Sequence, residues 1–283
     1  MNDIKPRPFK QVDVFTNNPF KGNPVAVILD GNGLSTEQMQ AIASWTNLSE
    51  TTFVCESEDP RADYRLRIFT PRSEIPFAGH PTIGSAWALL ERGLKPGKSG
   101  YLVQECGKGL VTLRLAGKNL FLELPEAKFL EMDESLTISA ANALGLEKKE
   151  ILRGASLDVG PVWLTLQLPS AQKVMDLKPD MARISTIEGQ TGITVFGLHQ
   201  DGKVEVRSFA PAFGVPEDPV CGSGNGCVAA LIRRYGIIPA SAYVALQGRN
   251  LGRDGRVEVE FDAEGTIWVG GNAVTCIEGS ISL

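Results

Sequence analysis

An internal repeat is the feature of this sequence that most restricts how the chain can fold. Four segments of the first half have counterparts in the second half, and they occur in the same order. The pairs are residues 23–27 with 160–164, 67–71 with 207–211, 78–93 with 221–236, and 101–104 with 243–247. One such match can arise by chance, but four in the same order indicate two copies of one structural unit.

Each copy combines short alternating strands with one strongly apolar helix. Strand patterns with tight turns, such as residues 110–115 and 120–124, favour antiparallel sheet. In the first copy, a helix over residues 82–92 is apolar nearly all round. Such a helix must be covered on most sides. We therefore predict an α+β fold of two pseudo-symmetric halves, each a mostly antiparallel, barrel-like sheet wrapped round a central helix.

The boundary between the halves is expected in the segment 125–132. We predict an N-terminal half of residues 1–127 and a C-terminal half of 128–274, with the last strand, 275–283, as a candidate to cross over to the first half. Before the first apolar helix, Ser35 and Gln38 form a capping-box pattern for a further helix that should end near Asn47. The pseudo-twofold places both apolar helix N-termini near the seam between the halves, which is a common place for a small-molecule site.

Composition and charge exclude several classes of function. The net charge is −5 and no Lys/Arg cluster stands out, which argues against nucleic acid as a partner. No stretch is apolar enough for a secretion signal or a membrane span, so we expect a cytoplasmic protein without membrane contact. Five cysteines without CxxC spacing, and only two histidines, indicate neither a disulfide framework nor a metal site. A homodimer is expected for an acidic, β-rich chain of this size.

The second apolar helix follows a glycine-rich turn that carries an acid and a thiol. Glu217-Asp218-Pro219-Val220-Cys221-Gly222-Ser223-Gly224 leads into the apolar run that stops at Gly236. Unpaired N–H groups and the helix dipole favour an anion at such a position. The same turn is also typical of a helix start that needs small residues for close packing, and the pattern alone does not separate the two interpretations.

Several segments together resemble the PhzF-like isomerases of phenazine biosynthesis. They are Asp13-x-Phe15, residues 22–27, Glu50 within 48–54, residues 69–81 and residues 217–223. The resemblance spans the whole chain. It implies the fold of the related diaminopimelate epimerases and proline racemases, which agrees with the repeat.

The resemblance also implies roles for individual residues. Glu50 would be the general acid/base that moves a proton between carbons of a small carboxylated substrate, with His80 and Asp218 as polar partners. The substrate's carboxylate or neighbouring polar groups would be bound by the helix-entrance residues Gly79, Cys221, Gly222 and Ser223. No cofactor is required for this chemistry.

One departure concerns the thiols. Racemases of this fold use a cysteine at each helix entrance, but the first of these positions is Ala78 here, and the second is Cys221. A thiol at a helix N-terminus tends to have a lowered pKa and can act as a base. We favour the alternative, in which Cys221 is a small side chain filling a tight turn.

Three functions therefore remain open from the sequence. The first is the Glu50-centred isomerase, the second an epimerase of amino-acid-type substrates in which Cys221 opposes Glu50, and the third a non-catalytic small-molecule-binding protein of the same fold. Outside the site, the four tryptophans are interpreted as core residues and His199 as a solvated turn residue.

Overall fold

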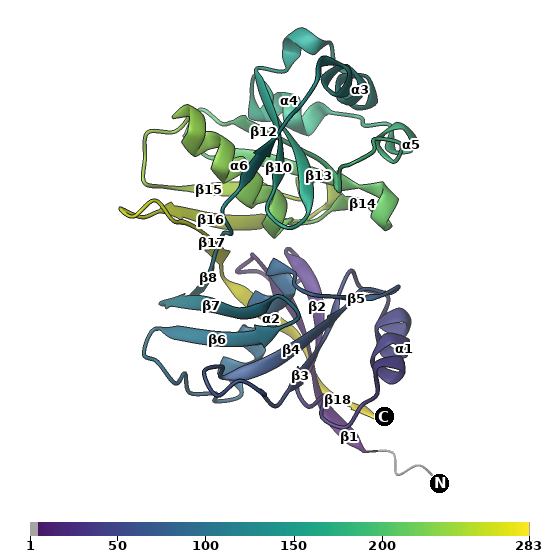
Figure 1. Cartoon of the computed structure of the whole chain (residues 1–283), viewed down its shortest axis with the longest axis vertical. Coiled ribbons are helices and arrows are strands. Elements are labelled where there is room, and N and C mark those ends of the chain that lie inside the picture. The colour runs from purple at the N-terminus through teal and green to yellow at the C-terminus, as the bar shows by residue number, and fades with distance from the viewer. Residues whose placement is uncertain (1–4, 283) are drawn as a thin grey trace. The chain divides into compact units, whose positions relative to one another are not determined.

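The computed structural model describes residues 5–282, and the chain divides into two compact units. Unit 1 comprises Met1–Leu122 with Gly270–Leu283, and unit 2 comprises Glu123–Val269. Each unit contains a sheet with helices packed against it, as the α+β prediction requires (Figure 1). No helix among the described residues is long and apolar enough to cross a membrane.

Unit 1 holds the first eight strands, two helices and the last strand. Its elements are β1 (Pro6–Val14), β2 (Asn23–Ile28), α1 (Thr36–Thr46), β3 (Thr51–Cys55), β4 (Tyr64–Phe69), β5 (Glu74–Ile75), α2 (Gly79–Glu91), β6 (Tyr101–Cys106), β7 (Gly109–Ala116), β8 (Asn119–Glu123) and β18 (Ala273–Ser282). The yellow strand β18 lies along the purple strand β1 (Figure 1), paired from Pro6 with Ser282 to Val14 with Ala273. The chain's beginning and end therefore belong to one sheet.

Unit 2 contains the remaining strands and helices. They are β9 (Lys128–Leu130), α3 (Glu134–Leu144), η1 (Lys148–Glu150), β10 (Arg153–Asp158), β11 (Val162–Gln167), α4 (Ala171–Asp176), α5 (Met181–Ile184), β12 (Gly192–Leu198), β13 (Val204–Ala210), η2 (Pro211–Phe213), β14 (Val215–Asp218), α6 (Gly222–Tyr235), β15 (Ala242–Gln247), η3 (Arg249–Leu251), β16 (Gly255–Phe261) and β17 (Ile267–Gly271).

The two units repeat one order of strand pairing. In unit 1, β1–β2, β3–β4 and β6–β7 are antiparallel, whereas β2–β3 and β4–β6 are parallel. In unit 2, β10–β11, β12–β13 and β15–β16 are antiparallel, and β11–β12 and β13–β15 are parallel. The predicted pseudo-symmetry is confirmed by this identical alternation of pairings.

The register of the strands corrects one detail of the repeat. Phe69 pairs with Thr51, which in turn pairs with Ala26. The counterpart of Phe69 is Phe209, which pairs with Ile193, and Ile193 pairs with Leu164. Ala26 therefore corresponds to Leu164, so the sequence match of 23–27 with 160–164 is displaced by one residue.

The central helix of each unit is buried against its sheet. In α2, Ile83, Ala86 and Leu89 are buried and the helix packs on β1, β2 and β3. Gly84 permits the close approach, because a Cβ there would lie 2.4 Å from Val25 Cγ1. The equivalent helix α6 packs on β10, β11 and β12 and buries the run from Gly224 to Ile232. These positions confirm the prediction of one covered apolar helix in each half.

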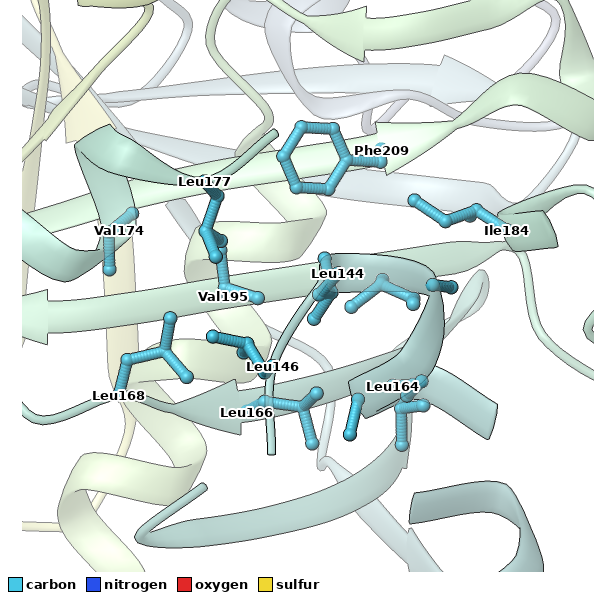
Figure 2. Packing of buried hydrophobic residues seen from close by; sticks show 14 residues of the cluster. Leu144, Leu146, Leu164, Leu166, Leu168, Val174, Leu177, Ile184, Val195 and Phe209 are labelled. Carbon is cyan, nitrogen blue, oxygen red and sulfur yellow. The ribbon is translucent and has the colours of Figure 1, made fainter. Parts of the chain in front are cut away.

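A second apolar layer covers the other side of the strands. In unit 2, Figure 2 shows Leu164, Leu166, Val195 and Phe209 from the sheet packed with residues of the flanking helices and loops, among them Leu144. In unit 1, α1 contributes Met39, Ile42 and Ala43 to a cluster that also contains Ile28, Phe53 and Phe69. Both faces of each sheet are thus apolar, as continuous hydrophobic strands require.

The predicted capping box of α1 is present, but one residue of this helix that was predicted to be buried is exposed. The Ser35 hydroxyl accepts a hydrogen bond from Gln38 N–H, and the Gln38 side-chain oxygen accepts one from Ser35 N–H. Asn47 ends the helix in the left-handed conformation. Trp45, interpreted as core, is 80% exposed. Met39, Ile42 and Ala43 form the covered side of α1 and Trp45 lies outside it, so the prediction for Trp45 was wrong.

Candidate active site

Glu50 is the residue directly before strand β3 of unit 1. Its carbonyl accepts a hydrogen bond from Ala26 N–H at 3.4 Å, which ties this residue to β2. The side chain is only 16% exposed. Burial raises the pKa of the Glu50 carboxyl to about 7, and a hydrogen bond from Ser49 opposes this in part. The removal of water from the charged form is the dominant cause.

His80 is buried in the first turn of α2, and its ring faces Glu50. His80 Nε2 lies 3.3 Å from Glu50 Oε2. On the other side of the ring, Nδ1 lies 3.5 Å from Nδ2 of Asn23. An amide nitrogen only donates, so Nδ1 is the acceptor and the proton of the neutral ring is on Nε2, toward Glu50. The pair therefore holds a carboxyl and an N–H donor side by side.

The N-terminus of α2 has no side-chain cap. Ala78 occupies the N-cap position in an extended conformation and makes no capping hydrogen bond. Pro81 has no N–H to satisfy, which suits its place in the first turn. Within residues 5–282, Gly79 N–H donates to no protein acceptor. This helix end therefore presents an uncompensated donor in the same turn as His80.

The N-terminus of α6 is capped by the thiol of Cys221. Cys221 Sγ accepts from Gly224 N–H at 3.3 Å, and Cys221 N–H donates to Gln247 Oε1 at 3.1 Å. Asn225 Nδ2 donates to the Cys221 carbonyl and to Gln247 Oε1, at 2.9 and 2.8 Å. Cys221 is thereby held by a network of buried polar groups.

Asp218 ends β14 beside the thiol. Its Oδ1 accepts from Val220 N–H at 3.1 Å, and its carboxylate is hydrogen-bonded to the Cys221 side chain. Burial, and after it the charge of Asp218, raise the pKa of the Cys221 thiol well above its ordinary value. The thiol is therefore protonated, which argues against a base at this helix N-terminus and agrees with the favoured interpretation of Cys221 as a small buried side chain.

Ser223 lies in the first turn of α6, between an indole and the thiol. Its Oγ accepts from Trp163 Nε1 at 3.0 Å and lies 3.6 Å from Cys221 Sγ. In the part of the chain that the structure describes, the N–H groups of Gly222 and Ser223 donate to no protein acceptor. The α6 entrance thus combines two backbone donors with a hydroxyl.

The structure brings the predicted site residues together in two groups. Glu50, His80 and Gly79 form one group in unit 1. Asp218, Cys221, Gly222 and Ser223 form the other in unit 2. Among the described residues, no cluster of three or more His, Cys, Asp or Glu side chains is arranged to hold a metal ion.

Sequence reasoning missed three polar residues that orient these groups. They are Asn23 at the His80 ring, Gln247 behind Cys221, and Trp163 at Ser223. Trp163 was correctly predicted to be buried, but its indole N–H has a polar partner that no local pattern indicates. His199, predicted to be solvated, lies with Nε2 2.8 Å from Oε2 of the buried Glu205, so that prediction was wrong.

Comparison with known sequences decides the family. The sequence model of the phenazine biosynthesis-like proteins, PhzC–PhzF, matches residues 12–279. The chain belongs to this family. The resemblance drawn from the motifs around Glu50, His80 and Asp218 is thereby confirmed.

Relatives of this PhzF-type chain are similar over nearly their whole length. Antisense-enhancing sequence 1 of Schizosaccharomyces pombe is 43% identical, over 96% of this chain and 97% of its own length. An uncharacterized isomerase of Pasteurella multocida is 34% identical, over 96% and 92%. The family and these relatives indicate an isomerase of the PhzF type.

Solved structures show the same fold. A PhzF-family protein of Bacillus anthracis aligns with a TM-score of 0.86 and 28% identity, over 99% of this chain and 100% of its own. A hydroxyproline epimerase from Agrobacterium vitis aligns with a TM-score of 0.63 and 14% identity, over 100% and 93%. At that identity the second likeness concerns the fold alone, and it confirms the predicted relation to the epimerase-like architecture.

Proposed function

We propose that this PhzF-type protein moves a proton between two carbons of a small carboxylated substrate, with Glu50 as the general acid/base. One observation carries the proposal. The Glu50 carboxyl is desolvated to a pKa of about 7, and its Oε2 lies 3.3 Å from His80 Nε2. A proton-transfer catalyst works best when its pKa lies near the working pH, and this carboxyl meets that requirement.

The proposed step is an exchange of one proton. The Glu50 carboxylate removes a proton from a substrate carbon, and the electron pair of the broken C–H bond delocalises into the adjoining unsaturated or carboxylate-bearing system. The resulting Glu50 carboxylic acid then returns the proton to a different carbon, where a new C–H bond forms. Glu50 ends in its starting form, and the substrate and product are isomers.

His80 is assigned the role of a polar partner of Glu50 in this scheme. Its Nε2 lies 3.3 Å from Glu50 Oε2, while Asn23 contacts the ring from the other side.

The residues of the helix entrances are proposed to bind the substrate's charged end. Gly222 and Ser223 offer backbone N–H groups without a protein acceptor among the described residues, at the positive end of the helix α6. Gly79 offers the same kind of donor at the start of α2. Asp218 is assigned the role of a polar partner through its bond to Cys221. Such fixed donors stabilise negative charge as it develops on the substrate.

The thiol is given no part in the proton transfer. A base must lose its proton near the working pH, whereas the Cys221 pKa is raised well above its ordinary value. Cys221 Sγ already accepts the Gly224 N–H as a helix cap. These observations favour the Glu50 isomerase over an epimerase in which Cys221 opposes Glu50.

The test compares two carboxylates at opposite ends of the same strand. Glu50 precedes β3, and the exposed Glu56 follows it. A panel of small carboxylic acids that bear a C–H next to a double bond is incubated with the protein in D₂O, and deuterium incorporation is followed by NMR. Glu50→Gln should slow incorporation by about 10²–10⁴-fold or more, because the amide cannot take up the proton. Glu56→Gln should leave the rate unchanged.

Two outcomes of this experiment would contradict the proposal. A folded Glu50→Gln variant that keeps the wild-type rate of exchange would remove Glu50 from the chemistry. A wild-type protein that binds members of the panel but exchanges none of them would support the non-catalytic binding protein instead.

A further inference from the structure

The indole of Trp163 is held in one orientation at the start of β11. Trp163 is buried and pairs with Gly192 of the neighbouring strand β12. A Cβ at Gly192 would lie 2.0 Å from Phe209 O and 3.0 Å from Trp163 Cζ3, so the glycine leaves the space that the ring occupies. Trp163 Nε1 then reaches Ser223 Oγ at 3.0 Å.

One hydrogen bond at Ser223 has a fixed direction. An indole N–H is only a donor, so Ser223 Oγ is the acceptor of the Trp163 bond. This bond uses one lone pair of the hydroxyl oxygen and leaves the hydroxyl proton available for a further partner. The nearby Cys221 Sγ lies 3.6 Å from Ser223 Oγ.

We propose that Trp163 is a positioning residue that holds the Ser223 hydroxyl in the orientation in which it donates its proton to the carboxylate of the substrate. The inference rests on the proposed function in that it takes the α6 entrance as the place where a carboxylate binds. It adds that a residue on another element, β11, orients the hydroxyl group of that place. The hydroxyl proton and the two backbone N–H groups then favour an anionic acceptor over an ammonium group.

The energetic reason is an exchange of a weak acceptor for a strong one. Without a ligand, the Ser223 hydroxyl lies 3.6 Å from a thiol sulfur, which accepts hydrogen bonds poorly. A carboxylate oxygen forms a shorter, charge-assisted bond. It can be bound by the Ser223 hydroxyl together with the N–H groups of Gly222 and Ser223 at the same helix end. Without the indole, the hydroxyl is free to rotate and the binding of an acceptor loses this preorganisation.

Unit 2 contains a second tryptophan that serves as a matched control. Trp268 Nε1 donates to Asp262 Oδ2 at 2.9 Å, away from the α6 entrance. A change of Trp268 to Phe removes the same indole N–H and the same amount of side chain as the change at Trp163. Any effect on ligand binding that is specific to Trp163 therefore reports on Ser223 rather than on the loss of a tryptophan.

The experiment titrates sodium acetate into ¹⁵N-labelled protein and follows the backbone amides of Gly222 and Ser223 and the indole N–H signals. Acetate should shift the two amides and the Trp163 indole saturably, and leave the Trp268 indole unmoved. Trp163→Phe should weaken acetate binding about fivefold, the usual effect of one neutral hydrogen bond. Trp268→Phe should not change it. Methylammonium chloride should shift none of these signals.

Ser223→Ala keeps the inference testable if Trp163→Phe disturbs the fold. This variant should weaken acetate binding and abolish the acetate-induced shift of the Trp163 indole, and adding Trp163→Phe should weaken binding no further. The inference is overturned if Trp163→Phe binds acetate as the wild type does, if the two effects simply add, or if Gly222 and Ser223 show no saturable shift.

The same titration separates this inference from the proposed function. Glu50→Gln should leave the acetate affinity and the indole shift unchanged, because Glu50 takes no part in the hydrogen bond between Trp163 and Ser223. If Glu50→Gln retains proton exchange while acetate still shifts the Trp163 indole, the assignment of the base fails and the role of Trp163 stands. If Glu50→Gln loses exchange but acetate shifts nothing at α6, the base stands and the role of Trp163 fails.

Discussion

The two helix entrances arise from one repeated unit, but they have diverged in opposite chemical directions. At α2, the entrance is Ala78-Gly79-His80, without a side-chain cap, and a buried carboxyl faces the histidine. At α6, it is Cys221-Gly222-Ser223, with a protonated thiol as the cap and a hydroxyl oriented by an indole. Unit 1 retains a titratable pair, whereas unit 2 retains fixed hydrogen-bond donors.

The register of the strands shows where the divergence lies in the sheets. Because Ala26 corresponds to Leu164, Val25 corresponds to Trp163 and Glu50 corresponds to Gly192. The position that carries the carboxyl in unit 1 is therefore a glycine in unit 2, and the space is occupied by an indole. In the proposed function, one copy of the scaffold thus supplies the proton-transfer group and the other copy supplies the anion-binding groups.

The largest expected difference between the units is in the stability that one ion pair contributes to each of them. Arg207 and Glu217 are only 6% and 8% exposed, and Arg207 also donates to the carbonyls of Val174 and Leu177. Arg207→Met would leave the Glu217 charge buried without a partner, and should lower the free energy of unfolding by about 3–5 kcal/mol.

The corresponding change in unit 1 is the control. Arg67 and Glu74 are 20% and 38% exposed, so Arg67→Met should cost only about 0–1 kcal/mol. Urea unfolding of both variants measures the contrast. Equal losses of stability would show that burial does not distinguish the two pairs.

A smaller effect is expected from the titration of Glu50. The pKa of this carboxyl is raised in the folded protein from 4.5 to about 7, so the folded state binds the proton more tightly than the unfolded state. The resulting stabilisation is fully present below pH 4.5 and is lost as the pH rises through about 7. It amounts to about 3 kcal/mol.

Comparison with a non-titrating variant isolates this contribution. Between pH 4.5 and 7, the wild type should lose up to about 3 kcal/mol of stability relative to Glu50→Gln, as measured by urea unfolding at each pH. Proton exchange should rise over the same range, because the carboxylate is the form that acts as the base. Parallel stability curves for the two proteins would contradict the raised pKa.

The smallest effect is expected at Cys221. Threonine also places an acceptor at the N-cap, so Cys221→Thr should change the free energy of unfolding by less than about 1 kcal/mol. It should retain proton exchange within a few-fold of the wild type, because the thiol is not the base. Loss of exchange in a folded Cys221→Thr protein would revive the epimerase in which this thiol opposes Glu50, and rapid, substrate-protected alkylation of Cys221 would point the same way.

The features that could be predicted from the sequence are those encoded locally. The capping pattern of Ser35 and Gln38 specifies the start of α1, and the continuous apolar stretches that follow Ala78 and Cys221 specify two covered helices. The repeat specifies that both helices have the same surroundings. Glu50 and His80 were found through the family's motifs and then proved to be neighbours in the structure.

The features that could not be predicted depend on contacts between distant elements. The tendency of a helix N-terminus to lower the pKa of a thiol does not decide the case of Cys221, because burial and Asp218 raise its pKa. The contact of His199 with Glu205 depends on the pairing of strands, and the contact of Trp163 with Ser223 depends on how α6 packs against the sheet. Trp45 was predicted to be buried because it is aromatic, but its residue type does not reveal which face of α1 is covered.

The pairing of β1 with β18 has a consequence for synthesis on the ribosome. The chain grows from its N-terminus, so β1 emerges long before its partner, Ala273–Ser282. Unit 2, which is continuous in sequence, can fold while the nascent chain is still attached, whereas β1 must wait for a strand that is synthesised only after the whole of unit 2. The unit that carries the proposed base is thus the later of the two to be completed, and a ribosome that stops before residue 273 releases no finished copy of it.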